Sequence, residues 1–429
     1  MKKAKGSGKK VEKNKNKSKN KNKNKEEKTD LREKFLRGIE HIFSMFKANN
    51  TLINVVTASL LIPGSRTLLR GIPGTGKTTL LRMLAKAFYG SDFTKVSFSQ
   101  NITPFDVFYY LNLGKLTKGI EEVTPRRIVT ARYKLFNELG RCPPAVQNEL
   151  LELLEEKQKS YRDKVFKSPE GVFFFDMNPQ DATSVELSDA LLDRMDVVVE
   201  VPALDMRKEF ELLYDMETGL KDLVEATPQC LTPEEMQQIW GEVDRVRVEP
   251  HVMFYMTILR ASVTRCRYYD KSLVPPDFIE QKCETCTYKN EFCYQLQSCN
   301  AFRITSAARK YAKAFAWLRG DGEVTFDDVI KAFAVALPHR IKLRPKFRNQ
   351  YGTPYLWVRD VFIPHAAKTK DKLWRESAKL LAEVLKGNDK AKEELRQRGD
   401  KDVAVYSLYE DWLGRKKELF AKLLWRQRR

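Results

Sequence analysis

Residues 71–79 read Gly71-Ile72-Pro73-Gly74-Thr75-Gly76-Lys77-Thr78-Thr79, a glycine followed after four residues by Gly-Lys-Thr. Glycines let the backbone curl so that successive N–H groups point at one anion, and a helix that begins near Thr78 adds the positive end of its dipole. The pattern predicts a phosphate-binding loop (P-loop) in which Lys77 reaches the β- and γ-phosphates and Thr78 faces Mg²⁺. We therefore expect this chain to bind ATP through Gly71, Pro73, Gly74, Thr75, Gly76, Lys77, Thr78 and Thr79.

The residues around the P-loop predict a strand, the loop and then a helix. Residues 66–70 (RTLLR) are typical of a buried strand, and residues 80–88 have apolar side chains at helical spacing. Further strand-like runs lie at 95–99, 133–137, 171–176 and 197–201, with helical stretches such as 145–156 between them. This alternation predicts an α/β fold with a mostly parallel, five-stranded sheet covered by helices on both faces.

Length and charge limit the organisation of the chain. It has 429 residues and a formal charge of +20, and the length predicts two or three domains. Residues 1–30 hold thirteen lysines and four acidic residues, a Lys/Asn-rich composition that predicts a disordered tail. Such a tail either only solvates the protein or attracts nucleic acid or another polyanion through its charge. No apolar run reaches the roughly 18 residues of a membrane span, so we expect no membrane contact. Most of the cysteines form one group with metal-like spacing, so we expect a reducing interior such as the cytoplasm.

Polar residues follow the strand-like runs beyond the P-loop. Asn137 and Glu138 end one run, where a P-loop enzyme places its Mg²⁺ acid and the base that activates water. Glu138 suits the base, whereas Asn137 would hold the Mg²⁺ water shell together with Thr78 but without a charge. Asn178 follows the next run and is placed to touch a γ-phosphate. Arg194 lies at the corner before the last run, where an arginine reaches a neighbouring subunit's nucleotide.

These motifs, in this order, resemble the MoxR family of AAA+ ATPases over roughly residues 33–340. The P-loop carries the resemblance together with residues 102–107 (ITPFDV), 137–147 (NELGRCPPAVQ), 178–179 (NP), 192–195 (LDRM) and 323–329 (EVTFDDV). The resemblance implies that Asn178 is the sensor 1 residue, Arg194 the arginine finger and Arg303 the sensor 2 residue, all with catalytic roles beside Glu138. It also implies that residues 159–166 form a hairpin directed at the centre of a ring.

The resemblance implies a homo-oligomeric ring, a hexamer, that hydrolyses ATP to remodel or mature partner proteins as a chaperone does. Such clients often contain a von Willebrand factor A domain. The family usually has aspartate where this chain has Asn137, so we expect hydrolysis to be weak. Two alternatives stay open at this point: a nucleic-acid-associated AAA+ motor or loader, suggested by the basic tail, and a nucleotide-gated scaffold with weak hydrolysis, suggested by Asn137.

Four cysteines form a second distinctive group, which is not part of the usual family pattern. Cys283, Cys286, Cys293 and Cys299 have the spacing C-x2-C-x6-C-x5-C. Four thiols within seventeen residues can close on one tetrahedral ion or on a cubane cluster, so the sequence predicts a Zn²⁺ or [4Fe–4S] site. Unliganded cysteines or two disulfides are the alternatives.

Together these features predict four segments. Residues 1–30 form the tail, residues 31–205 the AAA+ P-loop domain, residues 206–345 a helical lid with the cysteine loop at 283–299, and residues 346–429 a charged helical extension. In the extension, Trp374, Leu380, Leu381 and Leu385 have the spacing of a buried helical stripe.

Overall fold

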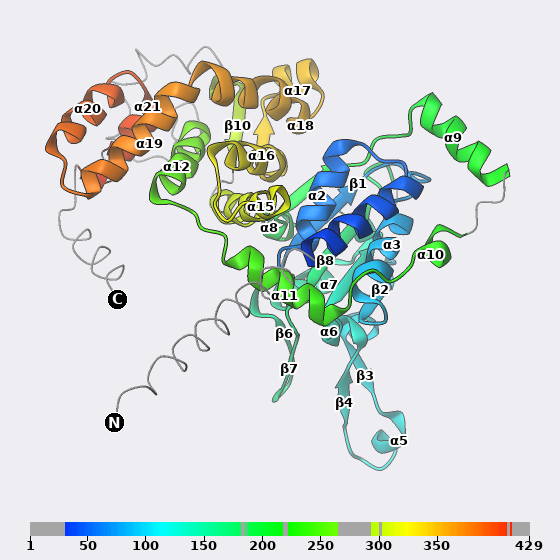
Figure 1. The fold of residues 1–429 in the computed structure, drawn as a ribbon. Helices are drawn as coiled ribbons and strands as arrows, with labels where there is room; N and C mark the ends of the chain where they lie inside the picture. The colour runs from blue at the N-terminus through cyan, green and yellow to red at the C-terminus, as the bar shows by residue number, and fades with distance from the viewer. Residues whose placement is uncertain are drawn as a thin grey trace, which may run out of the picture.

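The computed structural model describes residues 31–181, 185, 187–217, 222–264, 293–299, 303–409 and 412–413. The predicted tail at residues 1–30 lies outside this part of the chain. Figure 1 shows an α/β unit from which two hairpins extend, a group of lid helices beside it, and a helical C-terminal region beyond the lid. Within the described ranges, no helix is both long enough and apolar enough to cross a membrane.

Five parallel strands form the central sheet in the order β2-β5-β8-β1-β9. They are β1 (Arg66–Arg70), β2 (Phe93–Ser97), β5 (Tyr133–Asn137), β8 (Val172–Met177) and β9 (Val197–Glu200). The register pairs Leu69 of β1 with Asp176 and Phe136 of β5 with Phe175, so the carboxyl ends of these strands meet at one edge. The predicted five-stranded parallel sheet is confirmed, with the P-loop strand next to its centre.

Alternate residues of each strand enter separate apolar cores on the two faces of the sheet. On one face, Phe173 and Phe175 pack with α7 (Pro144–Glu156) and α8 (Asp189–Arg194). On the other, Val172 and Phe174 belong to the core that contains α2 (Asn50–Leu60), α3 (Lys77–Tyr89) and α15 (Ile304–Arg319). Burial on both faces explains why β8 reads as an almost continuous apolar run.

Two hairpins extend from the same side of the sheet (Figure 1). One is made of β3 (Tyr109–Leu111) and β4 (Val123–Pro125), with α5 (Leu113–Leu116) between them. The other, β6 (Gln158–Tyr161) and β7 (Lys164–Lys167), is the hairpin predicted at residues 159–166. Its base is held by Lys159, whose buried ammonium group pairs with Glu149 and, at 2.6 Å, with Glu152 of α7.

A buried arginine is one of the residues that join the lid to the sheet. The helices α15 and α16 (Phe326–Ala336) pack against each other, and β10 (Leu296–Cys299) pairs with β11 (Ile341–Leu343) in antiparallel fashion. The guanidinium of Arg340 donates to the carbonyl oxygens of Met195 at 2.6 Å and Asp196 at 3.0 Å. These bonds fix the lid at the corner between α8 and β9.

The remaining helices complete both layers and the C-terminal region. A helix over residues 31–45 precedes α2. The others are α4 (Pro104–Phe108), α6 (Arg127–Thr130), α9 (Met206–Glu217), α10 (Leu223–Ala226), α11 (Pro233–Asp244), α12 (Pro250–Thr264), α17 (Pro345–Tyr351), α18 (Pro354–Trp357), α19 (Asp371–Leu385), α20 (Asp389–Gly399) and α21 (Val403–Tyr409). In α19, Trp374 and Leu381 of the predicted stripe are fully buried, while Leu380 and Leu385 pack against the same core.

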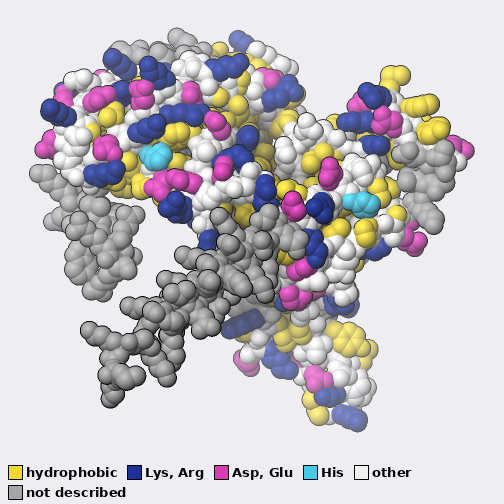
Figure 2. Space-filling model, viewed as in Figure 1, with side chains coloured by type: hydrophobic (Ala, Val, Ile, Leu, Met, Phe, Trp, Pro, Cys, Tyr) yellow, Lys and Arg dark blue, Asp and Glu magenta, His cyan; other side chains and the backbone are white. Residues whose placement is uncertain are grey.

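The helix α9 stands away from the rest of the domain and carries an apolar face. Met206, Phe210, Leu213 and Tyr214 are all more than half exposed, and Figure 2 shows this helix with apolar side chains on its surface. Their spacing of three to four residues places them along one side of the helix.

Candidate nucleotide-binding site

A polar cleft of about 620 Å³ opens at the carboxyl edge of the sheet, between the P-loop and the ends of β5 and β8. Its lining includes Pro73, Gly74, Gly76, Lys77, Thr78, Thr79, Asn137, Glu138 and Asn178, all of which the sequence predicts. It also includes Lys95, Gly140, Arg141, Asp176, Met177 and Asp181, which the sequence did not single out. The structure therefore brings the P-loop together with the predicted base and sensor 1 residue.

Glycine is required at three positions of the P-loop. Gly74 and Gly76 have φ angles of 79° and 73°, in the left-handed region that side chains other than glycine rarely adopt. At Gly71, an added Cβ would lie 2.5 Å from the carbonyl oxygen of Val201, so the backbone of the next segment leaves no room for a side chain. The Thr75 hydroxyl closes the turn by donating to the carbonyl oxygen of Ile72 at 3.0 Å.

Lys77 begins α3 and points its ammonium group back into the loop. Its Nζ donates to the carbonyl oxygens of Gly71 at 2.7 Å and Ile72 at 2.8 Å. Burial lowers the pKa of Lys77, and the negative charge of Asp176 opposes that shift. A cation at the start of a thirteen-residue helix, whose first N–H groups have no partner within the helix, is a suitable arrangement for phosphate oxygens.

Thr78 contacts a carboxylate that the sequence prediction missed. Asp176, near the end of β8, is 3% exposed and accepts the Thr78 hydroxyl at Oδ2 over 2.7 Å. Asn137, predicted to hold Mg²⁺, ends the adjacent strand, and its side-chain amide lies 2.8 Å from Thr78 Oγ1. The sequence did contain one indication of this role, an aspartate inside an apolar strand two residues before Asn178. Aspartate is almost never fully buried without a partner, so its presence there indicates a polar contact.

Glu138 occupies the position of the predicted base. Its backbone is left-handed, with φ 59° and ψ 47°, and its side chain is 47% exposed to the cleft. Arg141 pairs with Glu138 at 3.2 Å and with Asp181 at 2.7 Å, and the hydrogen bond to Asp181 raises the pKa of Arg141. Asn178 lies on the same wall of the cleft, where its Oδ1 accepts the N–H of Gln180 at 3.1 Å.

Arg194 and Arg303 lie together, and neither of them lines the cleft. Arg194 Nε is 3.1 Å from Glu155, and Arg303 reaches the same carboxylate at 3.3 Å while also pairing with Asp193 at 2.6 Å. Arg66, the first residue of β1, also contacts Glu155, at 3.5 Å. Arg194 and Arg303 therefore lie at the amino edge of the sheet, opposite the P-loop.

A smaller hollow of about 180 Å³ adjoins the P-loop at Thr75. Apolar side chains contribute much of its wall, including Phe46, Leu52 and Val201. Asn49 lies at its edge and caps α2 by accepting the Leu52 N–H at 2.8 Å. An apolar hollow beside a phosphate site can accept the flat face of a nucleotide base.

The structure describes only part of the predicted cysteine site. Cys283 and Cys286 lie outside the described residues, and Cys293 belongs to a short 3-10 helix before β10. Cys299 ends β10 as a buried thiol without a disulfide, and burial raises its pKa to about 12. Among the described residues, no group of three or more His, Cys, Asp or Glu side chains is arranged to hold a metal ion.

Two domain families match this chain in the order that the fold shows. Residues 66–195 match the AAA domain of the dynein-related subfamily, and residues 299–354 match an AAA lid domain. The crystal structure of a Cytophaga hutchinsonii protein shares the fold with a TM-score of 0.64 at 20% sequence identity. That similarity covers 80% of this chain and 97% of the other.

Some curated relatives carry the MoxR name. Protein MoxR of Methylorubrum extorquens is 29% identical over 192 residues, 44% of this chain and 55% of that protein. Chaperone MoxR1 of Mycobacterium tuberculosis is 26% identical over 216 residues, 50% of this chain and 52% of that one. Protein YeaC of Bacillus subtilis is 25% identical over 321 residues, 74% of this chain and 89% of that one. With the parallel sheet and the order of the motifs, these similarities support a MoxR-like AAA+ ATPase.

Proposed function

We propose that this chain binds ATP with Mg²⁺ in the cleft and hydrolyses it as part of a cytoplasmic ring that remodels client proteins. The observation that carries the proposal is the meeting of Lys77, Glu138 and Asn178 in one polar cleft. The P-loop N–H groups and Lys77 would hold the phosphates, and the adenine ring of ATP would lie in the hollow beside Thr75.

Each group in the cleft has a distinct role in the proposed reaction. Glu138 would accept a proton from the attacking water, and Asn178 would orient that water or the γ-phosphate. The oxygen donors around Thr78 suit Mg²⁺, which neutralises phosphate charge when bound. Lys77 is already aimed into the loop and would exchange its two carbonyl partners for phosphate oxygens.

The place of Arg194 supports assembly into a ring. β1 runs from Arg66, beside the Arg194 cluster, to Arg70, next to the P-loop, so a whole strand separates this arginine from its own cleft. Five residues of strand span on the order of 15 Å, which a side chain cannot bridge through the sheet. Arg194 would therefore complete the site of a neighbouring copy, and Arg303 would reach the same nucleotide.

Mixing of two inactive variants tests this arrangement. Lys77→Ala subunits lack a working P-loop but keep Arg194, whereas Arg194→Ala subunits have the opposite defect. When the two are mixed, some interfaces should join an intact P-loop to an intact Arg194, and ATP turnover should return. A mixture that stays as inactive as its components, while light scattering shows that it assembles, would contradict the shared site.

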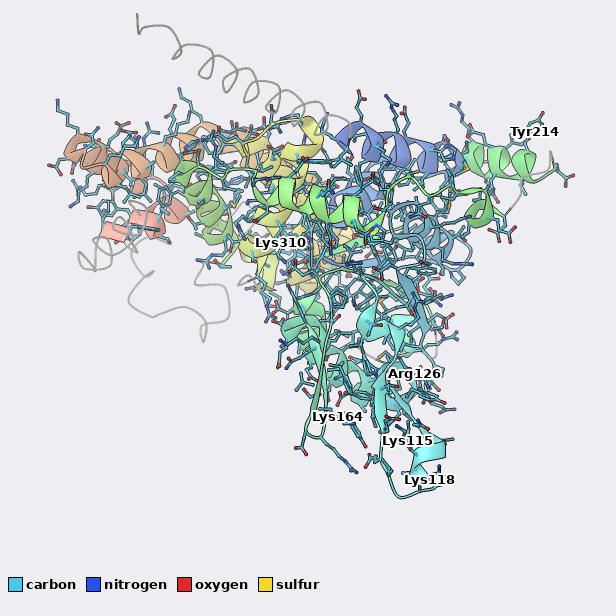
Figure 3. The ribbon with its side chains drawn as sticks, turned by 60° about the horizontal axis from the view of Figure 1, so that its bottom comes forward. Lys115, Lys118, Arg126, Lys164, Tyr214 and Lys310 are labelled. Carbon is cyan, nitrogen blue, oxygen red and sulfur yellow. The ribbon has the colours of Figure 1, made fainter. Side chains whose placement is uncertain are left out.

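The two hairpins are the proposed client contact. Figure 3 shows Lys115 and Lys118 at the end of one hairpin and Lys164 near the end of the other. Exposed apolar residues accompany them, namely Leu113, Ile120 and Val165. Mixed apolar and cationic tips of this kind suit an extended, acidic stretch of polypeptide.

Stimulation of ATP turnover tests the client proposal. A purified von Willebrand factor A domain should raise turnover of the intact chain, and the rise should be lost in Val165→Ser, whose basal rate should stay unchanged. Stimulation by single-stranded DNA or by RNA, weakening as salt increases, would favour the nucleic-acid motor instead.

A further inference from the structure

The carboxylate beside Thr78 lies on a different strand from the one where the sequence motif predicts it. Asn137 ends β5 with an uncharged amide, and the register pairs Phe136 with Phe175, so Asp176 follows at the neighbouring position of β8. The same register places Asp176 beside Leu69 of β1, the strand that leads into the P-loop. A negative charge is therefore present next to Thr78, one strand away from the expected place.

Each carboxylate oxygen of Asp176 accepts a hydrogen bond. Its Oδ2 accepts the Thr78 hydroxyl at 2.7 Å, and its Oδ1 accepts the Glu138 N–H at 2.7 Å. The carboxylate is 3% exposed, and Lys77 contributes a positive charge in the same cleft. This buried side chain therefore has a hydrogen-bond donor on each oxygen and a cation nearby, as a buried acidic group requires.

The Thr78 hydroxyl determines which way the Asn137 amide points. A hydroxyl has one hydrogen, and Thr78 donates it to Asp176, so the amide group facing Thr78 must itself be a donor. With nitrogen on that side, the Asn137 amide lies 2.8 Å from both Thr78 Oγ1 and Asp176 Oδ2. Its oxygen then accepts from Ser97 Oγ at 3.3 Å, on the side away from Asp176.

We propose that Asp176 supplies the charged oxygen for Mg²⁺ in this cleft, with Thr78 beside it, and that Asn137 is a positioning residue that holds Asp176. The Mg²⁺ role expected of Asn137 moves to its neighbour, because the amide oxygen is turned toward Ser97. Thr78 donates its hydrogen to Asp176 and accepts the Asn137 N–H, which leaves one lone pair of the hydroxyl oxygen for a cation. Mg²⁺ is usually held by one or two carboxylates together with substrate phosphates, which this set satisfies.

The inference rests on the proposed function, because the cation would enter the cleft with a nucleotide. Its test therefore separates cation binding from nucleotide binding. Mn²⁺ serves as a paramagnetic probe, and its affinity is measured by electron paramagnetic resonance in the presence of a non-hydrolysable ATP analogue. Affinity for the analogue alone is measured by calorimetry in EDTA.

Asp176→Asn removes the charge with almost no change in volume. Loss of a charge-assisted contact should weaken Mn²⁺ binding by about tenfold or more, while analogue binding in EDTA persists and shows that the variant is folded. The exchange variant Asn137→Asp/Asp176→Asn moves the carboxylate from β8 to β5 and should recover most of the Mn²⁺ affinity. Asp189→Asn, an exposed change on α8, is the matched control and should bind Mn²⁺ as the unmodified chain does.

Two results would overturn the assignment of Asp176. One is an Asp176→Asn variant that binds Mn²⁺ as tightly as the unmodified chain. The other is an Asp176→Asn variant with weakened Mn²⁺ binding that the exchange variant does not improve, since the charge would then not be interchangeable between the two strands. If the unmodified chain fails to bind the analogue even in EDTA, the proposed function fails first, and that outcome is distinct from both.

Discussion

The backbone N–H of Glu138 donates to Oδ1 of Asp176 across 2.7 Å, which joins the proposed base to the buried carboxylate on the next strand. The bond forms because Glu138 turns into the left-handed region directly after β5, with φ 59°. A backbone in this region is unfavourable for glutamate, and residues held this way cluster at functional sites. The bond therefore fixes the orientation from which the Glu138 side chain enters the cleft.

Replacement of Glu138 by glutamine should abolish ATP turnover and leave ATP bound. The change removes the basic carboxylate, while Lys77 and the P-loop N–H groups that hold the phosphates are untouched. Turnover is measured by phosphate release, and binding is measured by calorimetry. Glu209→Gln, on the exposed surface of α9, is the matched control and should turn over normally. Normal turnover in Glu138→Gln would assign the base to another residue.

Lys77→Ala should weaken ATP binding by about 2 kcal/mol or more, roughly thirtyfold in affinity, because a charge-assisted contact to phosphate is lost. Calorimetry in EDTA isolates this contact from that of the cation. Lys164→Ala, an exposed lysine of the β6–β7 hairpin, removes the same charge far from the P-loop. Equal affinity in both variants would mean that Lys77 does not hold the phosphates.

The sequence predicted the P-loop and the strands of the sheet because both depend on local patterns. Glycines at fixed spacing and short apolar runs can be read from neighbouring residues alone. Asp176 could not be recognised in the same way, because its role depends on β8 lying between β5 and β1, a pairing of segments far apart in the chain. Motif spacing assigned the Mg²⁺ contact to Asn137, which occupies the usual place of the aspartate. The carboxylate of Asp176 instead lies one strand away.

The position of Arg303 shows a similar limit. The resemblance predicted its role as the sensor 2 residue from its place at the start of a lid helix, but it did not predict on which side of the sheet that helix begins. The contacts of Arg340 with Met195 and Asp196 contribute to that placement, and they join segments almost 150 residues apart. Long-range packing of this kind is not visible in a local motif.

Lys134 should make stability depend on pH. It is fully buried in β5, where its ammonium group contacts the Ala131 carbonyl and lies 5.1 Å from the centre of the Phe173 ring. Burial lowers the pKa of Lys134 to about 7 from an ordinary value of 10.5. Between these values the unfolded chain binds a proton that the folded chain does not, so this group makes stability rise as pH increases from about 7 to 10.

Lys134→Met should therefore stabilise the fold at pH 7, by on the order of 2–4 kcal/mol, and should do so less at pH 9.5. Urea unfolding at the two pH values measures the difference. Lys164→Met, an exposed change in β7, should show no such dependence. A gain that is equal at both pH values would show that the lysine is charged throughout and that packing alone explains the effect.

The four-cysteine loop stays a prediction that elemental analysis can check. Purified protein should contain about one zinc, or about four irons with visible absorbance, per chain. Cys286→Ser should remove the metal and lower the temperature at which the lid unfolds, because bound metal contributes to folding. Cys230→Ser, a half-buried cysteine outside the group, should keep it. Protein that contains neither metal when purified without oxygen or chelators would rule out the site.

Arg303 should act on the same nucleotide as Arg194, because both pair with Glu155 at the amino edge of the sheet. Arg303→Ala should lower turnover, and mixing with Lys77→Ala subunits should restore it, as for Arg194→Ala. A mixture of Arg303→Ala with Arg194→Ala separates the possibilities further. If both arginines serve a neighbour, each interface built from these variants lacks one of them, and the mixture should stay inactive. If Arg303 instead served its own cleft, an Arg194→Ala subunit would keep it and would receive Arg194 from the other variant. Recovery of turnover in that mixture would therefore place Arg303 at the nucleotide of its own subunit, against the geometry of the Glu155 cluster.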